Sequence, residues 1–362
     1  RILLDIDVKK NSKIKVRKIY ISGVPDKMQG KLKRAMKKTK EKALINLLRS
    51  RKFIPEKYEE DKGFLIDRMN EAGYRDALLM TDSIVNVDER QIDIYLNVHQ
   101  GNKYYVRNID YVGNTVYPTS ILERTLQMNK GDVYNQKQLE KRLQVDDDAV
   151  HNLYYNNGYV FSNIQPVEVN VVGDSVDLEI RIVEGQQATF DHVRITGNDR
   201  VYENVIRREL RTKPGDLFSM EAIKRSVMSL GQMNMFDNEA LASSLNKSIH
   251  PNESNGTVDI TYPVLYKGAD QFSISAGWGP TGVVGTIGVK FNNFSMKNLF
   301  RKGKKHLGIL PQGDGQTFAL SGQTNGRYYQ SYSFQFLDPW FGGKRPNQFS
   351  VSMFYSKSSD VS

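Results

Sequence analysis

The chain contains no cysteine, which excludes a disulfide framework and thiolate metal sites. No run approaches the roughly 18 apolar residues of a membrane helix. No signal peptide is recognised, so we expect any export signal to lie upstream. The sequence has no phosphate-binding glycine loop and no nucleophile elbow. Its five histidines lie far apart without metal-ligand spacing, at His99, His151, His192, His250 and His306. The missing catalytic motifs argue against an enzyme, and we expect neither a cofactor nor a metal.

A repeated pattern with a period of about 84 residues organises most of the chain, and this period exceeds that of common solenoid repeats. Glycine recurs at equivalent ends of apolar runs, first at Gly23, Gly113 and Gly197 and again at Gly101, Gly185 and Gly268. The Gly-Asp turn at 131–132 reappears at 215–216. The sequence therefore predicts three small α/β units in tandem.

Each unit is predicted to run strand, helix, helix, strand, strand. In the third unit, apolar spacing predicts a helix over 202–211, and Ser219 is expected to cap a second helix. Strands are expected there over 239–249 and 257–266. The second unit follows the same order, with elements expected over 105–112, 119–127, 136–156, 161–172 and 175–183. Asn234 stands where the other units have glycine, so we expect a left-handed helix cap.

After Gly268 the composition changes to short alternating runs rich in Gly, Ser, Phe and Tyr. Phe272 and Ile274 alternate with small polar residues, and similar runs occur near 286–292, 317–321, 331–336 and 349–353. This alternation is typical of a transmembrane β-barrel, whose strands use ~9–11 residues to span a bilayer. A soluble sandwich with one wet face is the alternative. Because a closed membrane barrel needs about eight strands, we expect a fragment of a longer protein.

The net charge of +10 comes largely from the first unit. Basic residues crowd one expected long helix there, at Lys27, Lys31, Lys33, Arg34, Lys37, Lys38, Lys40 and Lys42. Such a helix is usually a solvated face, although it can bind anionic lipid. Nucleic acid is disfavoured, since the aromatic residues that stack on bases are not interleaved with these cations. Asp146-Asp147-Asp148 is expected to be a solvated patch on the helix over 136–156.

Two sequence stretches carry a resemblance to a known family. Val106-Arg107-Asn108-Ile109 leads into Gly113-Asn114, and Val193-Arg194-Ile195 leads into Gly197-Asn198. With the β-α-α-β-β order, these units resemble POTRA domains. Tandem POTRA domains that run directly into a barrel are the layout of the Omp85 superfamily, so the resemblance implies an α+β fold of POTRA repeats followed by the first antiparallel strands of a transmembrane β-barrel.

The resemblance implies five segments. Residues 1–12 correspond to the last strand of a preceding POTRA domain, and 13–101, 102–186 and 187–268 to the third, fourth and fifth domains. Residues 269–362 correspond to the N-terminal strands of a barrel of the ~16-stranded type. Within the superfamily, the chain is most similar to the central subunit of the outer-membrane β-barrel assembly machinery, with its POTRA domains in the periplasm.

That subunit folds and inserts β-barrel proteins, and the resemblance assigns three groups of residues. The first barrel strand would template a substrate strand, through Gln271, Phe272, Ser273, Ile274, Ser275, Ala276, Gly277, Trp278 and Gly279. POTRA edge strands would bind unfolded substrate by β-augmentation, through Phe161, Val167, Val169, Val171, Ala240, Leu241 and Leu245. The triplet Arg207-Arg208-Glu209 would dock a partner lipoprotein, although pairing of Glu203 with Arg207 along the helix also explains the charges.

The implied partners are unfolded outer-membrane β-barrel proteins, accessory assembly lipoproteins of the BamD type, and outer-membrane lipid. Two other functions fit the same architecture. One is a polypeptide-secreting Omp85 transporter of the two-partner secretion type, and the other is a periplasmic POTRA scaffold or holdase. The edge strands also carry polar residues that would protect them from aggregation, so binding and protection both remain open.

Overall fold

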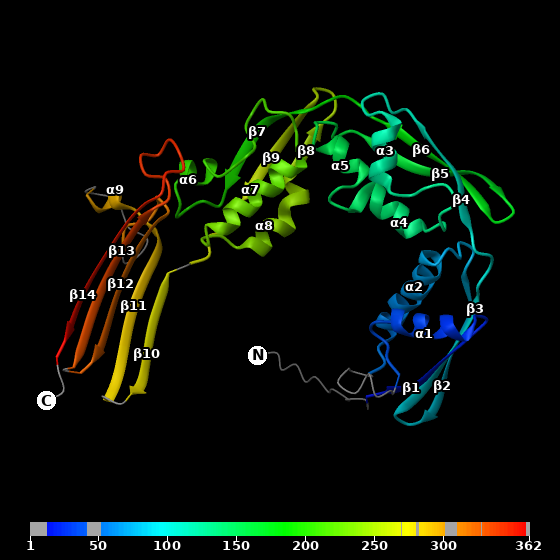
Figure 1. The fold of residues 1–362 in the computed structure, drawn as a ribbon, viewed down its shortest axis with the longest axis horizontal. Helices are drawn as coiled ribbons and strands as arrows, with labels where there is room; N and C mark the ends of the chain where they lie inside the picture. Colours follow the sequence, from blue (N-terminus) through cyan, green and yellow to red (C-terminus); the bar gives the residue numbers. More distant parts are fainter. Residues whose placement is uncertain are drawn as a thin grey trace, which may run out of the picture. The chain divides into compact units, whose positions relative to one another are not determined.

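The computed structural model describes residues 13–41, 52–268, 270–279, 282–300, 310–326 and 328–359. The chain forms two compact units, Arg1–Tyr154 with Ser162–Glu184, and Tyr155–Phe161 with Gly185–Ser362. The first unit holds two α/β repeats, and the second holds a third repeat followed by an antiparallel sheet (Figure 1). The expected strand of a preceding domain over residues 1–12 lies outside the described residues.

The first repeat is a three-stranded sheet that packs against two helices. Its elements are β1 (Lys15–Ser22), α1 (Asp26–Ala35), α2 (Pro55–Glu71), β2 (Leu78–Asp88) and β3 (Gln91–His99). The middle strand, β3, runs parallel to β1 and antiparallel to β2. Ile94 of β3 and Leu65 of α2 are fully buried, because the period-2 face of the strand meets the apolar stripe of the helix. Because β3 lies between the other two strands, β2 is an edge strand.

The other two repeats have the same sheet order. The second comprises β4 (Tyr105–Val112), α3 (Thr119–Leu126), α4 (Gln136–Glu140), η2 (Lys141–Val145), α5 (Val150–Tyr155), β5 (Asn163–Val172) and β6 (Ser175–Val183). The third comprises β7 (Thr189–Thr196), α6 (Glu203–Arg207), α7 (Met220–Gln232), α8 (Asn238–Ser244), η3 (Leu245–Ser248), β8 (Ile249–Asn252) and β9 (Thr257–Pro263). Their edge strands are β5 and β8, since β6 and β9 lie in the middle.

Glycine closes the first strand of each repeat for a steric reason. Gly113 has a φ of 90°, and a Cβ placed on it would lie 2.1 Å from the carbonyl oxygen of Ile182. Gly197 has a φ of 81°, and its Cβ would lie 2.2 Å from the carbonyl oxygen of Val264. Asn234 has a φ of 55°, so it adopts the left-handed cap that the sequence predicted.

An arginine on the first strand of each repeat pairs with an aspartate on the last strand. The pairs are Arg17 with Asp93, Arg107 with Asp177, and Arg194 with Asp259. The register between the parallel strands shifts at Arg17 and at Arg107. In the first two repeats the Val-Arg sequence thus corresponds to a bulge with an ion pair across it, whereas in the third repeat the register shifts between Phe190 and Val193.

The helix expected over 136–156 is interrupted at the three aspartates. Asp146 has an extended backbone after η2, and α5 begins only at Val150. Arg142 explains the break, because its Nη1 lies 2.6 Å from an oxygen of Asp148 and its Nε donates to the carbonyl of Thr125. The expected helix is therefore wrong at Asp146 and Asp148, whereas Asp148 is solvated as expected, since it is 69% exposed although it pairs with Arg142, as Asp146 also does.

The prediction of a long basic helix in the first repeat is also wrong. The helix α1 ends at Ala35, so Lys37, Lys38 and Lys40 follow it, and Lys42 lies outside the described residues. The reason is the buried carboxylate of Asp61 on α2, which accepts hydrogen bonds from the backbone N–H groups of Lys38 and Thr39. These bonds hold the chain in a turn.

The third repeat differs from the sequence prediction between its second helix and its last strand. Residues 239–249 were expected to form a strand, but α8 and η3 occupy 238–248 and the strand β8 begins only at Ile249. The side chain of Asp237 caps α8 by accepting from the N–H groups of Glu239 and Ala240. The helix α6 is likewise shorter than the predicted 202–211.

The C-terminal part is one antiparallel sheet in sequence order, as the alternation predicted. Its strands are β10 (Gln271–Gly279), β11 (Gly282–Phe294), β12 (Gln316–Asn325), β13 (Tyr329–Asp338) and β14 (Phe349–Ser358), with α9 (Met296–Leu299) between β11 and β12. The strands lie side by side in Figure 1, consistent with the start of a barrel. Among the described residues, no helix is both long enough and apolar enough to cross a membrane.

Candidate functional site

The strand β10 forms one edge of the C-terminal sheet. It pairs with β11 from Gln271 opposite Lys290 to Gly279 opposite Gly282. On its other side, no strand of the described residues is paired with it. All nine residues that the sequence predicted as a templating strand lie on β10. Among the described strands, this side of β10 is available for another strand, which would add through backbone hydrogen bonds.

The side chains of β10 make few contacts that would hold the strand in place. Phe272, Ile274 and Trp278 are 65%, 70% and 85% exposed. On the other face, Ser273 Oγ donates a long hydrogen bond of 3.4 Å to the carbonyl of Gly288. Nothing lies within 4 Å of a Cβ placed on Gly277. The strand is therefore held mainly by its backbone ladder to β11.

The edge strand β5 of the second repeat carries three of the predicted substrate-binding residues. Val169 and Val171 are exposed and Val167 is half-buried. Pro166 lies within the strand opposite Ile180, which suits an edge because proline donates no ladder hydrogen bond. The ladder to β6 uses one side of β5, and among the described strands the other side is unpaired.

The remaining predicted edge-strand residues do not lie on an edge strand. Phe161 precedes β5 and packs against the core of the third repeat. Ala240 and Leu241 lie on α8, and Leu245 begins η3. Leu241 is buried in the same core, as its four-residue spacing from Leu245 indicates. The edge of the third repeat is reduced to the four residues of β8, which include Pro251.

The strand β2 of the first repeat was missed by the sequence analysis. It is an edge strand of 11 residues, and only Leu79 is even partly buried. Its exposed apolar side chains are Leu78, Met80, Ile84, Val85 and Val87, which are 41–60% exposed. A run without glycine or proline that holds this many apolar residues was the available signal. Among the described edges of the three repeats, β2 is the longest and offers five exposed large apolar side chains.

The triplet predicted to dock a partner divides into two parts. Arg207 is exposed at the end of α6 and pairs with Glu203, the intrahelical pair that the sequence left open. Arg208 and Glu209 turn toward the loop between β13 and β14 and are only 15% and 22% exposed. There, Trp340 Nε1 donates to Glu209 at 2.6 Å, and the Arg208 guanidinium lies over the Trp340 ring. The surface left for a partner is therefore centred on Arg207.

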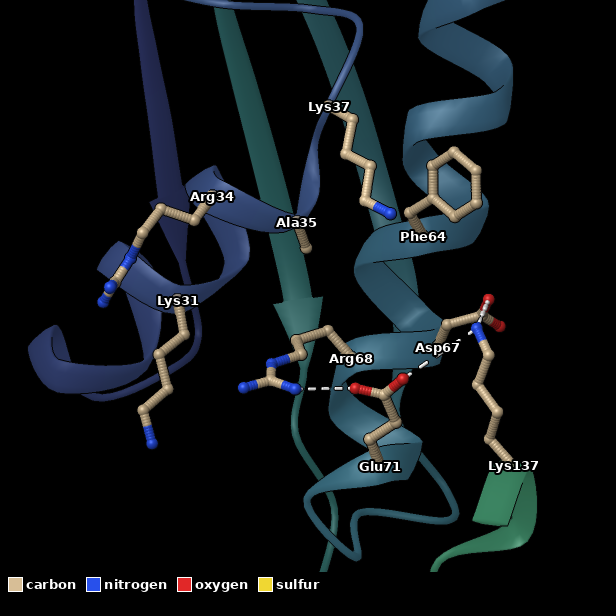
Figure 2. Close-up of a pocket in the computed structure, with 9 residues that line it drawn as sticks. All are labelled: Lys31, Arg34, Ala35, Lys37, Phe64, Asp67, Arg68, Glu71 and Lys137. Carbon is tan, nitrogen blue, oxygen red and sulfur yellow. Dashed lines mark hydrogen bonds and ion pairs between the residues drawn. The ribbon is translucent and has the colours of Figure 1, made fainter. Parts of the chain in front are cut away.

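A basic cleft of 440 Å³ lies between α1 and α2 in the first repeat (Figure 2). Lys137 reaches into it from the second repeat and pairs with Asp67 at 2.7 Å. Arg68 pairs with Glu71. Lys31, Arg34 and Lys37 also line the cleft, and none of them has an ion pair within the described residues. The cleft thus combines a connection between two repeats with a solvated basic surface.

One cluster could offer ligand atoms to a metal ion. Asp191, His192 and Asp259 place one such atom each within 4.8 Å of one another. The histidine spacing in the sequence gave no sign of this cluster, because Asp259 lies on β9 whereas Asp191 and His192 lie on β7. Burial acts to raise the pKa of Asp259, but the hydrogen bonds from His192 together with the charges of His192 and Arg194 outweigh it, so that the pKa is lowered. Arg194 lies 3.3 Å from the same carboxylate, so Asp259 already has a cationic partner within the repeat.

The family model described as "POTRA: Surface antigen variable number repeat" matches residues 104–185 and 188–265. A BamA outer membrane protein assembly factor from Neisseria meningitidis serogroup B is 29% identical over 314 residues, covering 84% of this chain and 37% of that protein. A putative outer membrane protein assembly factor from Treponema pallidum is 24% identical over 292 residues, covering 79% and 32%. The chain therefore spans about a third of the length of these curated relatives.

Solved structures agree with the fold. The BamA POTRA3-5 structure from Haemophilus influenzae has a TM-score of 0.55 at 17% identity and covers 72% of this chain and 100% of its own. BamA from Haemophilus ducreyi lacking POTRA domains 1-3 has a TM-score of 0.53 at 16% identity, covering 70% and 43%. The predicted fold class is confirmed, and so is the predicted likeness to outer membrane protein assembly factors.

Proposed function

Because the chain is a BamA-like protein of the Omp85 superfamily with POTRA domains, we propose that it is the central component of an outer-membrane β-barrel assembly machinery. In this function it folds and inserts other β-barrel proteins. The observation that carries the proposal is the order of the chain, in which POTRA repeats lead into an antiparallel sheet whose first strand, β10, is held mainly by its backbone ladder to β11. The location proposed is the outer membrane, with the repeats in the periplasm.

The strand β10 is the proposed template for an incoming strand. Substrate strands would add to its free edge by backbone hydrogen bonds, which carry little sequence preference. The exposed Phe272, Ile274 and Trp278 would face lipid on one side of the growing sheet. Substrates of unrelated sequence could therefore use the same edge.

The repeats are the proposed holding sites for substrate before insertion. β2 and β5 each present an unpaired edge with exposed apolar residues. An extended polypeptide could add to either strand by the same backbone pairing. β8 is too short to contribute more than two or three hydrogen bonds. We assign β2 the main role, because it is the longest edge and its side chains are the most exposed.

Arg207 is the proposed contact for an accessory lipoprotein of the BamD type. It is exposed at the end of α6, whereas its neighbours Arg208 and Glu209 face the sheet. A partner carboxylate would have to compete with Glu203 for the guanidinium, which is feasible because an exposed pair along a helix contributes only ~0.3–0.5 kcal/mol.

The first experiment depletes the full-length protein in its native cell and measures folded against unfolded outer-membrane barrels. A general loss of many unrelated barrels is expected. Intact barrels with a single exported polypeptide missing would refute the proposal and point to a two-partner secretion transporter. Unchanged barrels and unchanged export would leave a periplasmic scaffold or holdase.

A second experiment addresses β10 directly. Cysteines introduced one at a time at Ser273 and Ser275 are tested for disulfide bonds to a cysteine in the last strand of a stalled substrate. The chain has no cysteine of its own, so the background within this segment is low. A cysteine at Ser333 on β13, which lies in the interior of the described sheet, is the matched control. Equal cross-linking at Ser273 and Ser333 would contradict templating by β10.

A further inference from the structure

The third repeat contacts the C-terminal sheet through the loop between β13 and β14. The Cζ atom of Arg208 lies 5.1 Å from the centre of the Trp340 ring, within the range of a cation–π interaction. The indole N–H of Trp340 donates to Glu209 at 2.6 Å, which makes a charge-assisted hydrogen bond. One aromatic residue thus holds two neighbouring charges of opposite sign.

Arg208 is largely withdrawn from solvent at this contact. Its side chain is buried enough to lower the pKa of the guanidinium, against the opposing effect of the nearby Glu209 carboxylate. Its Nη2 donates a long hydrogen bond of 3.5 Å to the carbonyl of Asp314, in the segment that leads into β12. The backbone N–H of Trp340 donates to the side chain of Asp338, so the backbone that carries the ring is anchored to the end of β13 as well.

A second polar contact joins the same repeat to the segments between β11 and β12. Tyr202 Oη donates to Asn298 at 2.9 Å, and its backbone N–H donates to the carbonyl of Gly313. Asn293 is buried, and its amide donates to the carbonyl of Arg200 at 2.7 Å. A Cβ on Gly313 would lie 2.7 Å from the Tyr202 ring. The repeat is therefore closely fitted to this side of the sheet.

The N-terminal end of β10 is less closely packed against the repeat. A hollow of 700 Å³ lies there, bounded by the start of α8 and by the ends of β10 and β11. It is lined by Asp237, Lys267, Gln271 and Lys290 among others. Two long hydrogen bonds to Asp270, at 3.3 and 3.4 Å, come from Asn292 and Gln312. The repeat thus contacts the segments that join β11 to β12 and β13 to β14, and the hollow beside the start of β10 stays open.

We propose that Arg208, Glu209 and Trp340 are positioning residues of the assembly site, which hold the third repeat on the turns of the sheet and so keep the hollow below β10 open to an incoming strand. This inference rests on the proposed templating by β10. It assigns Arg208 and Glu209 to a contact inside the protein, whereas the adjacent Arg207 stays available to a partner. Loss of the contact lets the repeat shift into the hollow and obstruct the edge.

The test uses the full-length protein in lipid nanodiscs, labelled with 5-fluorotryptophan. The Trp340 resonance is identified as the one lost in Trp340→Phe. Arg208→Ala is expected to shift this resonance, because the cation leaves the face of the ring. Arg207→Ala is the matched control, one residue away on the same helix end, and should leave the resonance in place. An unmoved resonance in Arg208→Ala would overturn the contact itself.

The positioning role is measured separately, by disulfide formation between a cysteine at Gln271 and a cysteine in a stalled substrate strand. Arg208→Ala and Trp340→Leu are expected to reduce the initial cross-linking rate roughly threefold to tenfold, while binding of the accessory lipoprotein is unchanged. Arg208→Lys should retain part of the rate, since an ammonium can still lie over the ring. Arg225→Ala is the control for the rate, because Arg225 is exposed on α7 and pairs with Glu221 of the same helix, and it should leave the cross-linking rate unchanged.

Two outcomes of the cross-linking experiment overturn the inference. If cross-linking occurs in the unaltered protein and persists at the same rate in Arg208→Ala, the positioning role is wrong although templating stands. If the unaltered protein gives no cross-link at Gln271, the templating function fails, and the positioning role fails with it. The fluorine resonance then still decides whether the contact exists, so the two failures are distinguishable.

Discussion

Arg17 lies over Asp93 in the first repeat, with its Nε 2.9 Å from an oxygen of that carboxylate. The two side chains differ in exposure, because Arg17 is 44% exposed and Asp93 only 2%. The hydrogen bond from Arg17 lowers the pKa of Asp93 and outweighs the effect of burial, which acts in the opposite direction. A buried carboxylate is thus kept ionised by an arginine that reaches it from the surface.

The first prediction concerns acid stability. Because the folded-state pKa of Asp93 lies below its unfolded value of about 3.9, its contribution is present above that value and is lost as the pH falls through the folded pKa. We expect the melting temperature of the first repeat to fall between pH 5 and pH 2. In Asp93→Asn the melting temperature should be lower at pH 7 and should change less over the same interval. An identical acid dependence in both proteins would contradict this account.

The second prediction compares two glycines of the third repeat. Gly197 and Gly215 both have positive φ, at 81° and 87°, but a Cβ would meet the Val264 carbonyl oxygen only at Gly197, whereas at Gly215 it would face open space. Gly215→Ala should cost about 1–2 kcal/mol of unfolding free energy from backbone strain alone. Gly197→Ala should cost more than about 3 kcal/mol, because the first and last strands must also separate. Chemical denaturation measures both, and equal losses would refute the steric argument.

The third prediction concerns the exposed edge β2. Val85→Lys places a charge on this edge, and such charges oppose strand addition. We expect weaker capture of an unfolded substrate barrel by the repeats, with a change in unfolding free energy within about 0.5 kcal/mol because Val85 is exposed. Photo-crosslinking to the substrate measures capture. Val183→Lys is the matched control, since Val183 is an exposed valine at the end of the central strand β6.

Much of the fold could be predicted because local residues decide it. The left-handed turn at Gly113, the cap at Asn234 and the alternation of β10 depend on neighbours within a few residues. The strand expected over 239–249 was wrong for a reason visible in the sequence. Asp237 is a good helix cap, and Leu241 and Leu245 have helical spacing. We nevertheless predicted a strand, because the repeated order of strands and helices placed one at this position.

The site could be predicted only in part. All of β10 was found, since a strand is recognised from its own alternation. The contact of Trp340 with Glu209 joins residues 131 positions apart, and nothing in either local sequence indicates the other. The triplet around Arg208 was interpreted as one surface for the same reason. On a helix end, adjacent residues point in different directions, and only the packed structure determines which one faces the sheet.

The last prediction concerns the connection between the first two repeats, which ion pairs of Arg75 and Lys137 cross. Arg75 lies 2.5 Å from Glu168, and Lys137 lies 2.7 Å from Asp67 and 3.9 Å from Glu71. Each pair is partly exposed, so each should contribute no more than about 1 kcal/mol. That is nevertheless enough to change how often the repeats separate, because the linker near residues 100–104 is short and these pairs act on the same motion.

The double variant Arg75→Met with Lys137→Met should therefore broaden the distance distribution between one spin label on each repeat, measured by double electron–electron resonance. High salt should broaden the distribution of the unaltered protein in the same direction, since exposed ion pairs are screened. Arg181→Met is the control, because Arg181 pairs with Glu179 on the same strand, β6, and not across the two repeats. If Arg181→Met broadened the distribution as much as the double variant did, a general loss of surface charge would explain the effect. If neither did, the linker and the apolar contacts would be sufficient to make the arm semi-rigid.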